Sequence, residues 1–189
     1  MSLSKDYLTT ICYYTLLKNK LYIYQFFMED LVKKIGDLLV AKNMTIGTAE
    51  SCTAGLIGAA LASVNGASRY FRGGFITYAT EIKEDILGVS HETISRYDVV
   101  SYQVAEEMAI NAQRSLRSNY VISITGYAGD TGGSAQSPRG TVWICVASAN
   151  SNVTVRKLFV NGKRGENIQK CVIAALELAY NVINGNVYD

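Results

Sequence analysis

The spacing of hydrophobic residues changes from segment to segment along the chain, and these changes predict alternating strands and helices. From Met28, the segment "MEDLVKKIGDLLVAKN" places apolar residues every three or four positions, which is typical of an amphipathic helix. Short runs rich in β-branched and aromatic residues predict strands at 44–49, 73–79 and 120–126. Each of these strands except the last is followed by a helical pattern, beginning with "CTAGLIGAALASV".

Two later apolar runs, "GTVWICVAS" and "NVTVRKLFV", are joined by a polar turn at 150–152 and predict a hairpin. A long helical pattern, "GENIQKCVIAALELAYNVI", follows the hairpin. Thr80, Ser90 and Ser101 stand where a side-chain oxygen can cap the start of a helix. Strands that alternate with helices, plus one hairpin, predict an α/β fold, a three-layer α/β/α sandwich with a mostly parallel mixed sheet.

The first 27 residues do not fit this alternation. They contain five of the 13 tyrosines, and Lys18-Asn19-Lys20 interrupts their apolar run. A membrane-spanning helix needs about 20 mostly apolar residues, and a secretory peptide needs a small-residue cleavage signal. We find neither here. We expect a domain at 28–189 and an N-terminal extension at 1–27, which is either an appended helix that packs on a partner or a consequence of start-site choice. We assign the extension no catalytic role.

Composition and charge narrow the classes of function. Hydrophobic residues make up 49% of the chain and charged residues 18%, which is typical of one globular domain. The formal charge of +2 arises within residues 1–27, and the remainder carries 15 basic and 15 acidic residues. A nucleic-acid-binding protein usually shows a basic stripe, so this neutral domain disfavours that function. Four cysteines without CxxC spacing and a single histidine argue against a metal site and indicate reduced thiols in a cytoplasmic protein.

In open α/β sheets the chemistry usually lies beyond the carboxyl ends of the strands. Three loops meet that description: "AESCTAG", the end of "FITYATEIK", and "TGYAGDTGGSAQSPRGT". The third, the glycine-rich loop at 126–140, holds five of the 16 glycines. Backbone N–H groups of such a loop can cradle a phosphate, although a plain flexible connector has the same composition.

Ser51 lies where a strand gives way to a helix, and the residues allow three interpretations. It can be a nucleophile beside backbone N–H groups that hold an oxyanion, a helix cap, or the neighbour of a reactive Cys52. His91, the only histidine, is expected at a helix start on the surface and gives little support for a catalytic triad. Lys83 follows the strand that ends at Tyr78, and it can act as a base if burial lowers its pKa. A solvated helix lysine fits the same spacing.

Five blocks of the sequence together resemble the CinA C-terminal domain family, the nicotinamide mononucleotide deamidases. They are "TAESCTAGL", "YFRGGFITYATEIKEDILGV", "VSYQVAEEMA", "ISITGYAGDTGGS" and "PRGTVWICVA", and the resemblance runs from about Met28 to about Ile183. It implies an α/β/α sandwich, an amidohydrolase activity on a pyridine nucleotide as small-molecule substrate, and assembly into homo-oligomers.

The resemblance also implies site residues. Ser51 would attack the carboxamide carbon, Lys83 would take the serine proton and deliver it to the leaving amine, and Tyr78 would relay or orient that proton. Water would then release nicotinate mononucleotide, and this scheme needs neither a metal nor an organic cofactor. The expected substrate-binding residues come from the first two blocks and the glycine-rich loop: Glu50, Cys52, Thr53, Gly55, Arg72, Thr125, Gly126, Gly132, Gly133 and Ser134.

Four positions depart from the family pattern. The family usually has glycine at Ala54, a smaller aliphatic residue at Tyr127, proline at Asp130 and lysine at Ser137. A methyl group at position 54 is tolerable if the backbone there is helical. A carboxylate at position 130 would oppose a bound phosphate. These departures leave open a binding or assembly module that keeps the fold without turnover.

Overall fold

The computed structural model describes residues 25–149 and 152–186, and its centre is a five-stranded sheet in the order β2-β1-β3-β4-β5. β1 pairs in parallel with β2 and β3, whereas β4 is antiparallel to β3 and β5. Only β4 therefore runs against the other strands, and the predicted mostly parallel mixed sheet and its hairpin are confirmed. The strands are β1 (Ile46–Glu50), β2 (Phe71–Ile76), β3 (Tyr120–Gly126), β4 (Thr141–Ala147) and β5 (Val153–Phe159).

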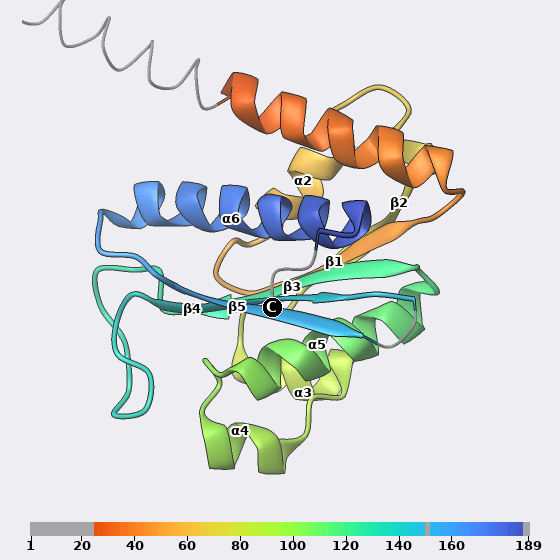
Figure 1. Cartoon of the computed structure of the whole chain (residues 1–189). Coiled ribbons are helices and arrows are strands. Elements are labelled where there is room, and N and C mark those ends of the chain that lie inside the picture. Colours follow the sequence, from red (N-terminus) through yellow and green to blue (C-terminus); the bar gives the residue numbers. More distant parts are fainter. Residues whose placement is uncertain (1–24, 150–151, 187–189) are drawn as a thin grey trace, which may run out of the picture.

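Helices cover both faces of the sheet and complete the predicted three layers (Figure 1). The helix at 25–41 lies on one face together with α2 (Leu56–Ala62) and α6 (Arg164–Asn184). The opposite face carries α3 (Thr80–Leu87), α4 (His91–Tyr97) and α5 (Tyr102–Leu116). A short 3₁₀ turn, η1 (Ala67–Arg69), precedes β2.

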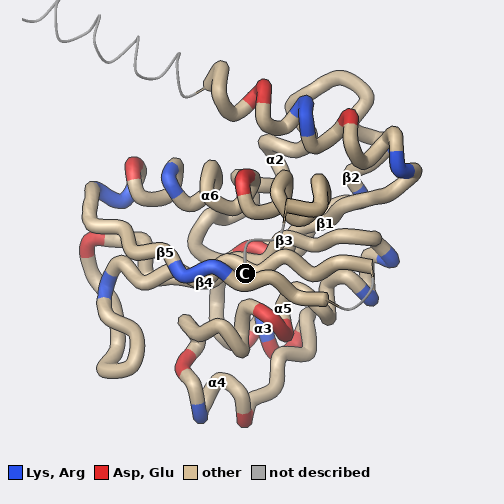
Figure 2. The backbone as a smooth tube through the Cα atoms, viewed as in Figure 1, with Lys and Arg blue, Asp and Glu red and all other residues tan. Residues whose placement is uncertain are grey.

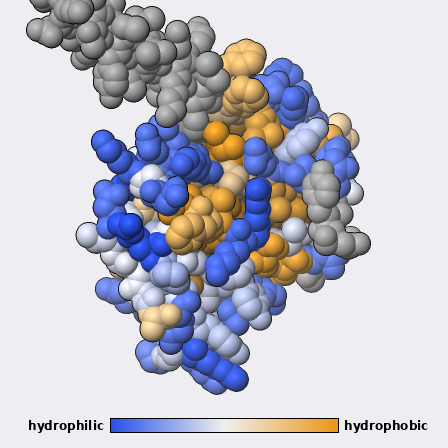
Figure 3. Space-filling view, turned by 60° about the vertical axis from the view of Figure 1, so that its left-hand side comes forward, coloured by the Kyte–Doolittle hydropathy of each residue, from blue (hydrophilic) through white to orange (hydrophobic). Residues whose placement is uncertain are grey.

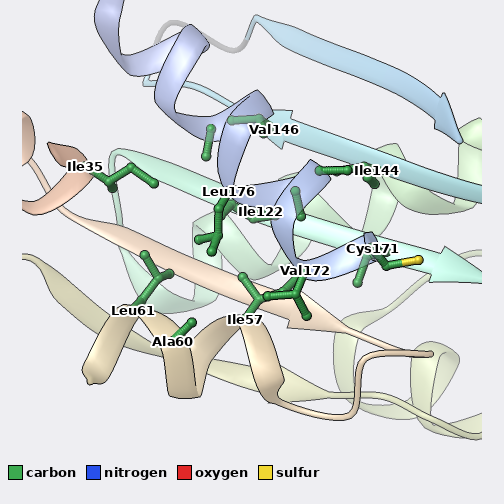
Figure 4. Packing of buried hydrophobic residues seen from close by; sticks show 14 of the residues in the cluster. Ile35, Ile57, Ala60, Leu61, Ile122, Ile144, Val146, Cys171, Val172 and Leu176 are labelled. Atoms are coloured by element: carbon green, nitrogen blue, oxygen red, sulfur yellow. The ribbon is translucent and has the colours of Figure 1, made fainter. Parts of the chain in front are cut away.

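Each interface between the sheet and a helical layer is a separate hydrophobic cluster. On the α6 face, Ile57 of α2, Ile122 of β3 and Leu176 of α6 point toward one another (Figure 4). On the α5 face, Val104 and Met108 lie one helical turn apart and pack with Val121 of β3. The near-continuous apolar strands follow from this arrangement, because a sheet covered on both faces has no polar side.

The register brings several chain segments to one edge of the sheet. Glu50, at the end of β1, is paired with Ile76 of β2 and Ile124 of β3, so the carboxyl ends of these strands lie together. Because β5 runs in the same direction, its last residue, Phe159, also lies at this edge, and α6 begins there. With that side of the molecule turned forward, hydrophobic residues show in the middle of the surface between hydrophilic ones (Figure 3).

Local details of the helix starts differ from the sequence predictions in part. The Ser90 and Ser101 side chains accept hydrogen bonds from backbone N–H groups and cap α4 and α5 as predicted. The prediction that Thr80 caps its helix was wrong by one position, because Ala79 is the N-cap residue of α3. Residues 25–27 are already helical, so this helix starts before Met28, and the rest of the predicted extension, residues 1–24, lies outside the described residues.

A buried carboxylate replaces the serine cap that was one interpretation of Ser51. α2 starts only at Leu56, with Gly55 at its N-cap and no side-chain cap from that residue. The Oε2 atom of Glu50 instead accepts from the Thr53 hydroxyl at 2.7 Å and from the backbone N–H groups of Gly55 and Ile57 at 3.0 and 3.1 Å, while Oε1 accepts from Gly58 at 2.8 Å. One acidic side chain thus fixes both the 51–55 turn and the start of α2.

We expect Glu50→Ala to lower the free energy of unfolding by at least about 3 kcal/mol, because each buried donor left without an acceptor costs about 1–3 kcal/mol. Urea denaturation measures the change, and Glu177→Ala is the matched control, since its carboxylate is half exposed on α6. The control should lose no more than about 0.5 kcal/mol. A loss below about 1 kcal/mol for Glu50→Ala would show that the carboxylate is not what holds the turn.

Candidate active site

Ser51 and Lys83 meet at the carboxyl edge of the sheet. The backbone N–H of Ser51 donates to the carbonyl of Ile124 at 3.1 Å, which ties the serine to the end of β3. Lys83 reaches it from the first turns of α3, and its Nζ lies 3.1 Å from Ser51 Oγ. The two predicted catalytic residues, 32 positions apart in the chain, are therefore in direct contact.

Lys83 is buried, with 1% of its surface exposed. Its Nζ also contacts the carbonyl oxygens of Thr77 at 2.7 Å and Tyr78 at 3.3 Å. Burial disfavours the charged ammonium and lowers the pKa of Lys83 from its ordinary value of 10.5 to about 8. Two carbonyl oxygens and one serine hydroxyl satisfy the three N–H donors of an ammonium, and equally the two donors and one lone pair of a neutral amine. Burial is therefore what favours the form that can accept a proton.

A cavity of about 330 Å³ opens beside this pair. The segments that follow β1, β2 and β3 line it, together with residues 99–100 and the first residue of α6. Its lining residues are Ser51, Cys52, Tyr78, Thr80, Lys83, Val99, Val100, Thr125, Gly126, Tyr127, Ala128, Gly129, Thr131 and Arg164. A cavity of this kind, with a few polar groups converging on it, is typical of small-molecule sites.

Tyr78 lines the cavity, but its contacts differ from the predicted proton relay. Its ring is largely exposed, and its hydroxyl accepts a hydrogen bond from Arg164 Nη2 at 2.9 Å. Only its backbone carbonyl contacts Lys83. The structure therefore joins Tyr78 to an arginine, and its hydroxyl does not hydrogen-bond to Ser51 or Lys83.

Cys52 lines the cavity, but its thiol is a poor rival to Ser51. A hydrogen bond with Cys171, followed by burial, raises the pKa of Cys52 well above its ordinary value, so the reactive thiolate is disfavoured. Near the serine, the backbone N–H groups of Cys52 and Thr53 donate to no backbone carbonyl among the described residues, and the weak thiol acceptor of Cys52 is the one contact recorded for its own N–H. Two N–H groups beside a hydroxyl, neither held by a backbone carbonyl, are suitable donors for an oxyanion. His91 is exposed and contacts Glu84 at 3.0 Å, outside the cavity.

Four of the substrate-binding residues predicted from the first two blocks do not line the cavity. Glu50, Thr53 and Gly55 form the hydrogen-bonded turn that holds Ser51, and the side chain of Thr53 is fully buried. Arg72 lies near the start of β2, at the opposite end of that strand from the site, and its Nε donates to the Leu116 carbonyl at 3.4 Å. The prediction for Arg72 was therefore wrong, because this residue belongs to the second block in sequence but lies away from the site in space.

The glycine-rich loop lines the cavity with its first part, residues 126–129 and 131, and not with its later residues as predicted. Thr125 and Gly126 line the cavity, whereas Gly132, Gly133 and Ser134 do not. The Ser134 hydroxyl instead donates to the carboxylate of Asp98. These three residues shape the far side of the loop.

Two of the departures from the family pattern have clear structural settings. Asp130 is exposed and does not line the cavity, and its carbonyl accepts from Arg139 at 2.8 Å. Ala54 has φ +50°, so the helical backbone on which the tolerance of a methyl group depended is absent. This left-handed conformation favours glycine.

Arg164 was missed by the sequence analysis, although a signal for it exists. It is the first residue of α6, and its guanidinium lies at the mouth of the cavity with Tyr78. In the predicted hairpin, the first strand runs against the preceding strand at 120–126, and the second strand runs in the same direction as that preceding strand. The predicted hairpin thus already placed the start of the last helix at the carboxyl edge, where a basic residue can face the site.

Other binding chemistries find little support among the residues that the structure describes. Within them, no group of three or more His, Cys, Asp or Glu side chains could hold a metal ion. None of the described helices is both long and apolar enough to cross a membrane. Basic and acidic residues are scattered over the described backbone and do not gather into one continuous basic band (Figure 2).

Comparison with known proteins matches the chain to the model of the CinA C-terminal domain over residues 28–183. A CinA-like protein of Flavobacterium psychrophilum is 42% identical over 158 residues, which are 84% of this chain and 38% of that protein. The nicotinamide-nucleotide amidohydrolase PncC of Escherichia coli strain K12 is 39% identical over 137 residues, which are 72% of this chain and 83% of PncC.

The fold is shared with solved structures. The crystal structure of the competence/damage inducible protein CihA from Agrobacterium tumefaciens superposes with a TM-score of 0.79 at 36% identity, covering 83% of this chain and 95% of that one. The chain spans about two fifths of the CinA-like relative from Flavobacterium but most of PncC.

The buried amine predicts a pH dependence of stability. Below pH 8, Lys83 is protonated in both folded and unfolded protein, so the cost of burying the ammonium is fully present. Between pH 8 and 10.5 only the unfolded protein keeps the proton, and the free energy of unfolding rises with pH. Relative to Lys83→Met, the unmodified protein should gain about 3 kcal/mol between pH 7 and pH 10.5. Urea denaturation at both pH values measures this gain, and an unchanged difference would mean that Lys83 keeps an ordinary pKa.

Proposed function

Because the chain belongs to the CinA C-terminal domain family, we propose that it hydrolyses the carboxamide of nicotinamide mononucleotide to nicotinate mononucleotide and ammonia. The observation that carries this proposal is the contact between Ser51 and the buried Lys83 inside a cavity. The similarity to PncC, whose name states this type of activity, supports the choice of substrate.

The first chemical step joins Ser51 to the substrate. Neutral Lys83 accepts the proton of the Ser51 hydroxyl, and Oγ forms a bond to the carboxamide carbon. The negative charge that develops on the carboxamide oxygen is held by the N–H groups of Cys52 and Thr53. The amide C–N bond then breaks, Lys83 returns the proton to the leaving nitrogen, and ammonia departs from an acyl-enzyme.

The second step repeats this chemistry with water. Lys83 takes a proton from the attacking water, the ester bond to Ser51 breaks, and the serine regains its proton as nicotinate mononucleotide leaves. The substrate itself favours the neutral amine, because its pyridinium ring is positively charged and a like charge nearby lowers the pKa of Lys83 further. The fraction of Lys83 that is neutral near pH 7 is about a tenth in the free protein and rises in the complex.

The phosphate group requires a positive site at a distance from the carboxamide, and the start of α6 provides one. Arg164 presents a guanidinium there as the first residue of α6, and the side chain of the N-cap residue, Lys163, makes no capping hydrogen bond. An arginine at a helix N-terminus favours a phosphate through charge and hydrogen bonds. Its hydrogen bond to the Tyr78 hydroxyl at 2.9 Å keeps the guanidinium at the cavity. In this arrangement Arg164, and not the predicted Arg72, is the arginine that binds the substrate.

We expect Ser51→Ala to abolish release of ammonia from nicotinamide mononucleotide while the protein stays folded, because Ser51 caps no helix and its loss removes only the nucleophile. Cys52→Ala is the matched control and should keep most of the turnover. Ammonia release by both variants and by the unmodified protein makes the measurement, with circular dichroism as the check on folding. Retained activity in Ser51→Ala would refute the nucleophile, and an unmodified protein without turnover would indicate the alternative, a binding or assembly module.

A further inference from the structure

Asp98 has a backbone conformation that is unusual for its residue type. It directly follows α4 with φ 73° and ψ 152°, a region that side-chain-bearing residues rarely adopt and that glycine adopts freely. The strain persists because the surrounding contacts hold the carboxylate in place. The Tyr127 hydroxyl donates to Oδ1 at 3.3 Å, and the Ser134 hydroxyl donates to Oδ2. The strained residue thus anchors the glycine-rich loop.

The residues after Asp98 strengthen this attachment through their backbone. The carbonyl of Val99 accepts from the Thr125 hydroxyl at 2.9 Å, and the carbonyl of Val100 accepts from the Ser137 hydroxyl at 2.6 Å. Val99 and Val100 themselves line the cavity. Segment 98–100 and the glycine-rich loop therefore form one connected wall of the site.

The alternation of side chains along β3 places the Tyr127 ring on the face of the sheet that carries α5. Along β3, the Ser123 hydroxyl donates to the Ala105 carbonyl of α5, and Thr125 points toward Val99 in the same way. Residues two apart on an extended chain share a face, so Tyr127 follows them toward the cavity that it lines. A Cβ atom added at Gly132 would lie 3.3 Å from Cδ1 of the ring, so the glycine leaves the space that the Tyr127 ring needs. Burial and then Asp98 raise the pKa of Tyr127, so its hydroxyl stays a donor.

We propose that Tyr127, oriented by Asp98, is the surface on which the positively charged pyridinium ring of the substrate binds, and that this pair selects a cationic ring over an uncharged one. The inference rests on the proposed function and names the feature of the substrate that the site recognises. Tyr127 would touch the substrate, whereas Asp98 is a positioning residue.

The charges around the cavity explain why such a surface is needed. Lys83 and Arg164 both line the cavity and are both basic, so a cationic ring entering between them is repelled. The face of an aromatic ring carries a partial negative charge and attracts a cation. The Asp98 carboxylate, which accepts a hydrogen bond from the Tyr127 hydroxyl, adds further negative potential. Tyr127 and Asp98 together offset the repulsion at the wall where the ring would lie.

The test compares two ligands that differ in ring charge. Nicotinamide mononucleotide and its 1,4-dihydro form share the carboxamide, ribose and phosphate, but only the former carries a cationic ring. Calorimetric titration in the Ser51→Ala background measures binding of both without turnover. We expect the cationic ligand to bind about tenfold more tightly, and Tyr127→Leu to remove that preference by weakening only the cationic ligand.

Three further variants separate recognition from structure. Tyr127→Phe keeps the ring and should retain most of the preference, whereas Asp98→Asn should reduce it and, with Ser51 intact, raise KM for nicotinamide mononucleotide more than it lowers kcat. Tyr102→Leu is the matched control, because this tyrosine is exposed beside Trp143 and does not line the cavity, and it should change neither affinity.

The outcomes distinguish this inference from the proposed function. Equal weakening of both ligands by Tyr127→Leu would show that the pair only braces the loop, and the inference would be wrong even if the unmodified protein releases ammonia. A Tyr127-dependent preference in a protein that releases no ammonia would support the inference and refute the proposed function. Failure of nicotinamide mononucleotide to bind would overturn both.

Discussion

The carboxylate of Glu50 accepts hydrogen bonds from the Thr53 hydroxyl and from three backbone N–H groups, and the geometry of the site depends on this cluster. The chain must leave β1, turn through residues 51–55 and start α2 with its first N–H groups satisfied. Because the buried acid satisfies them from within the strand, Ser51 is free of any capping role. Its hydroxyl can therefore face Lys83, and the N–H groups of Cys52 and Thr53 donate to no backbone carbonyl in the described part of the chain.

Glu50 is buried with hydrogen-bond donors that stabilise its charge, whereas Lys83 is buried in surroundings that disfavour its charge. Among residues 25–149 and 152–186, the fold encloses an amine without a carboxylate in hydrogen-bonding contact, and its recorded partners are two carbonyl oxygens and the Ser51 hydroxyl. This arrangement costs stability wherever the amine is protonated, and it brings the pKa of Lys83 to about 8, near the range where a general base is effective. The same charge balance bears on the substrate, since a cationic ring promotes the neutral amine but needs a negative surface elsewhere. Tyr127 and Asp98 lie on the wall that could supply it.

The sequence predicted the parts of the fold that periodicity determines. Apolar runs and helical spacing were sufficient for the five strands, the hairpin and the three layers, and the spacing of Ser51, Tyr78 and Lys83 placed them at one sheet edge. What it could not predict were contacts made by single side chains over long separations. Three such contacts depend on rotamers and backbone angles that leave no periodic pattern. They are the capping of α2 by Glu50, the hydrogen bond from Ser134 to Asp98, and the hydrogen bond from Arg164 to Tyr78. The prediction that Arg72 binds substrate was wrong for a related reason: Arg72 belongs to β2, but it lies at the start of the strand and the site lies at its end.

The central claim is that a neutral Lys83 activates Ser51, and the pH dependence of turnover tests it most directly. kcat/KM for nicotinamide mononucleotide, which reports ionisations of the free protein, should rise with pH through an ionisation near 8 and then level off. The ionisation seen in kcat should lie lower, because the bound cationic ring disfavours the ammonium. Lys83→Arg should remove nearly all turnover at every pH, since arginine keeps the charge and does not release its proton. A kcat/KM that shows no ionisation between pH 7 and 9, together with substantial turnover by Lys83→Arg, would contradict the account and make Lys83 an electrostatic anchor.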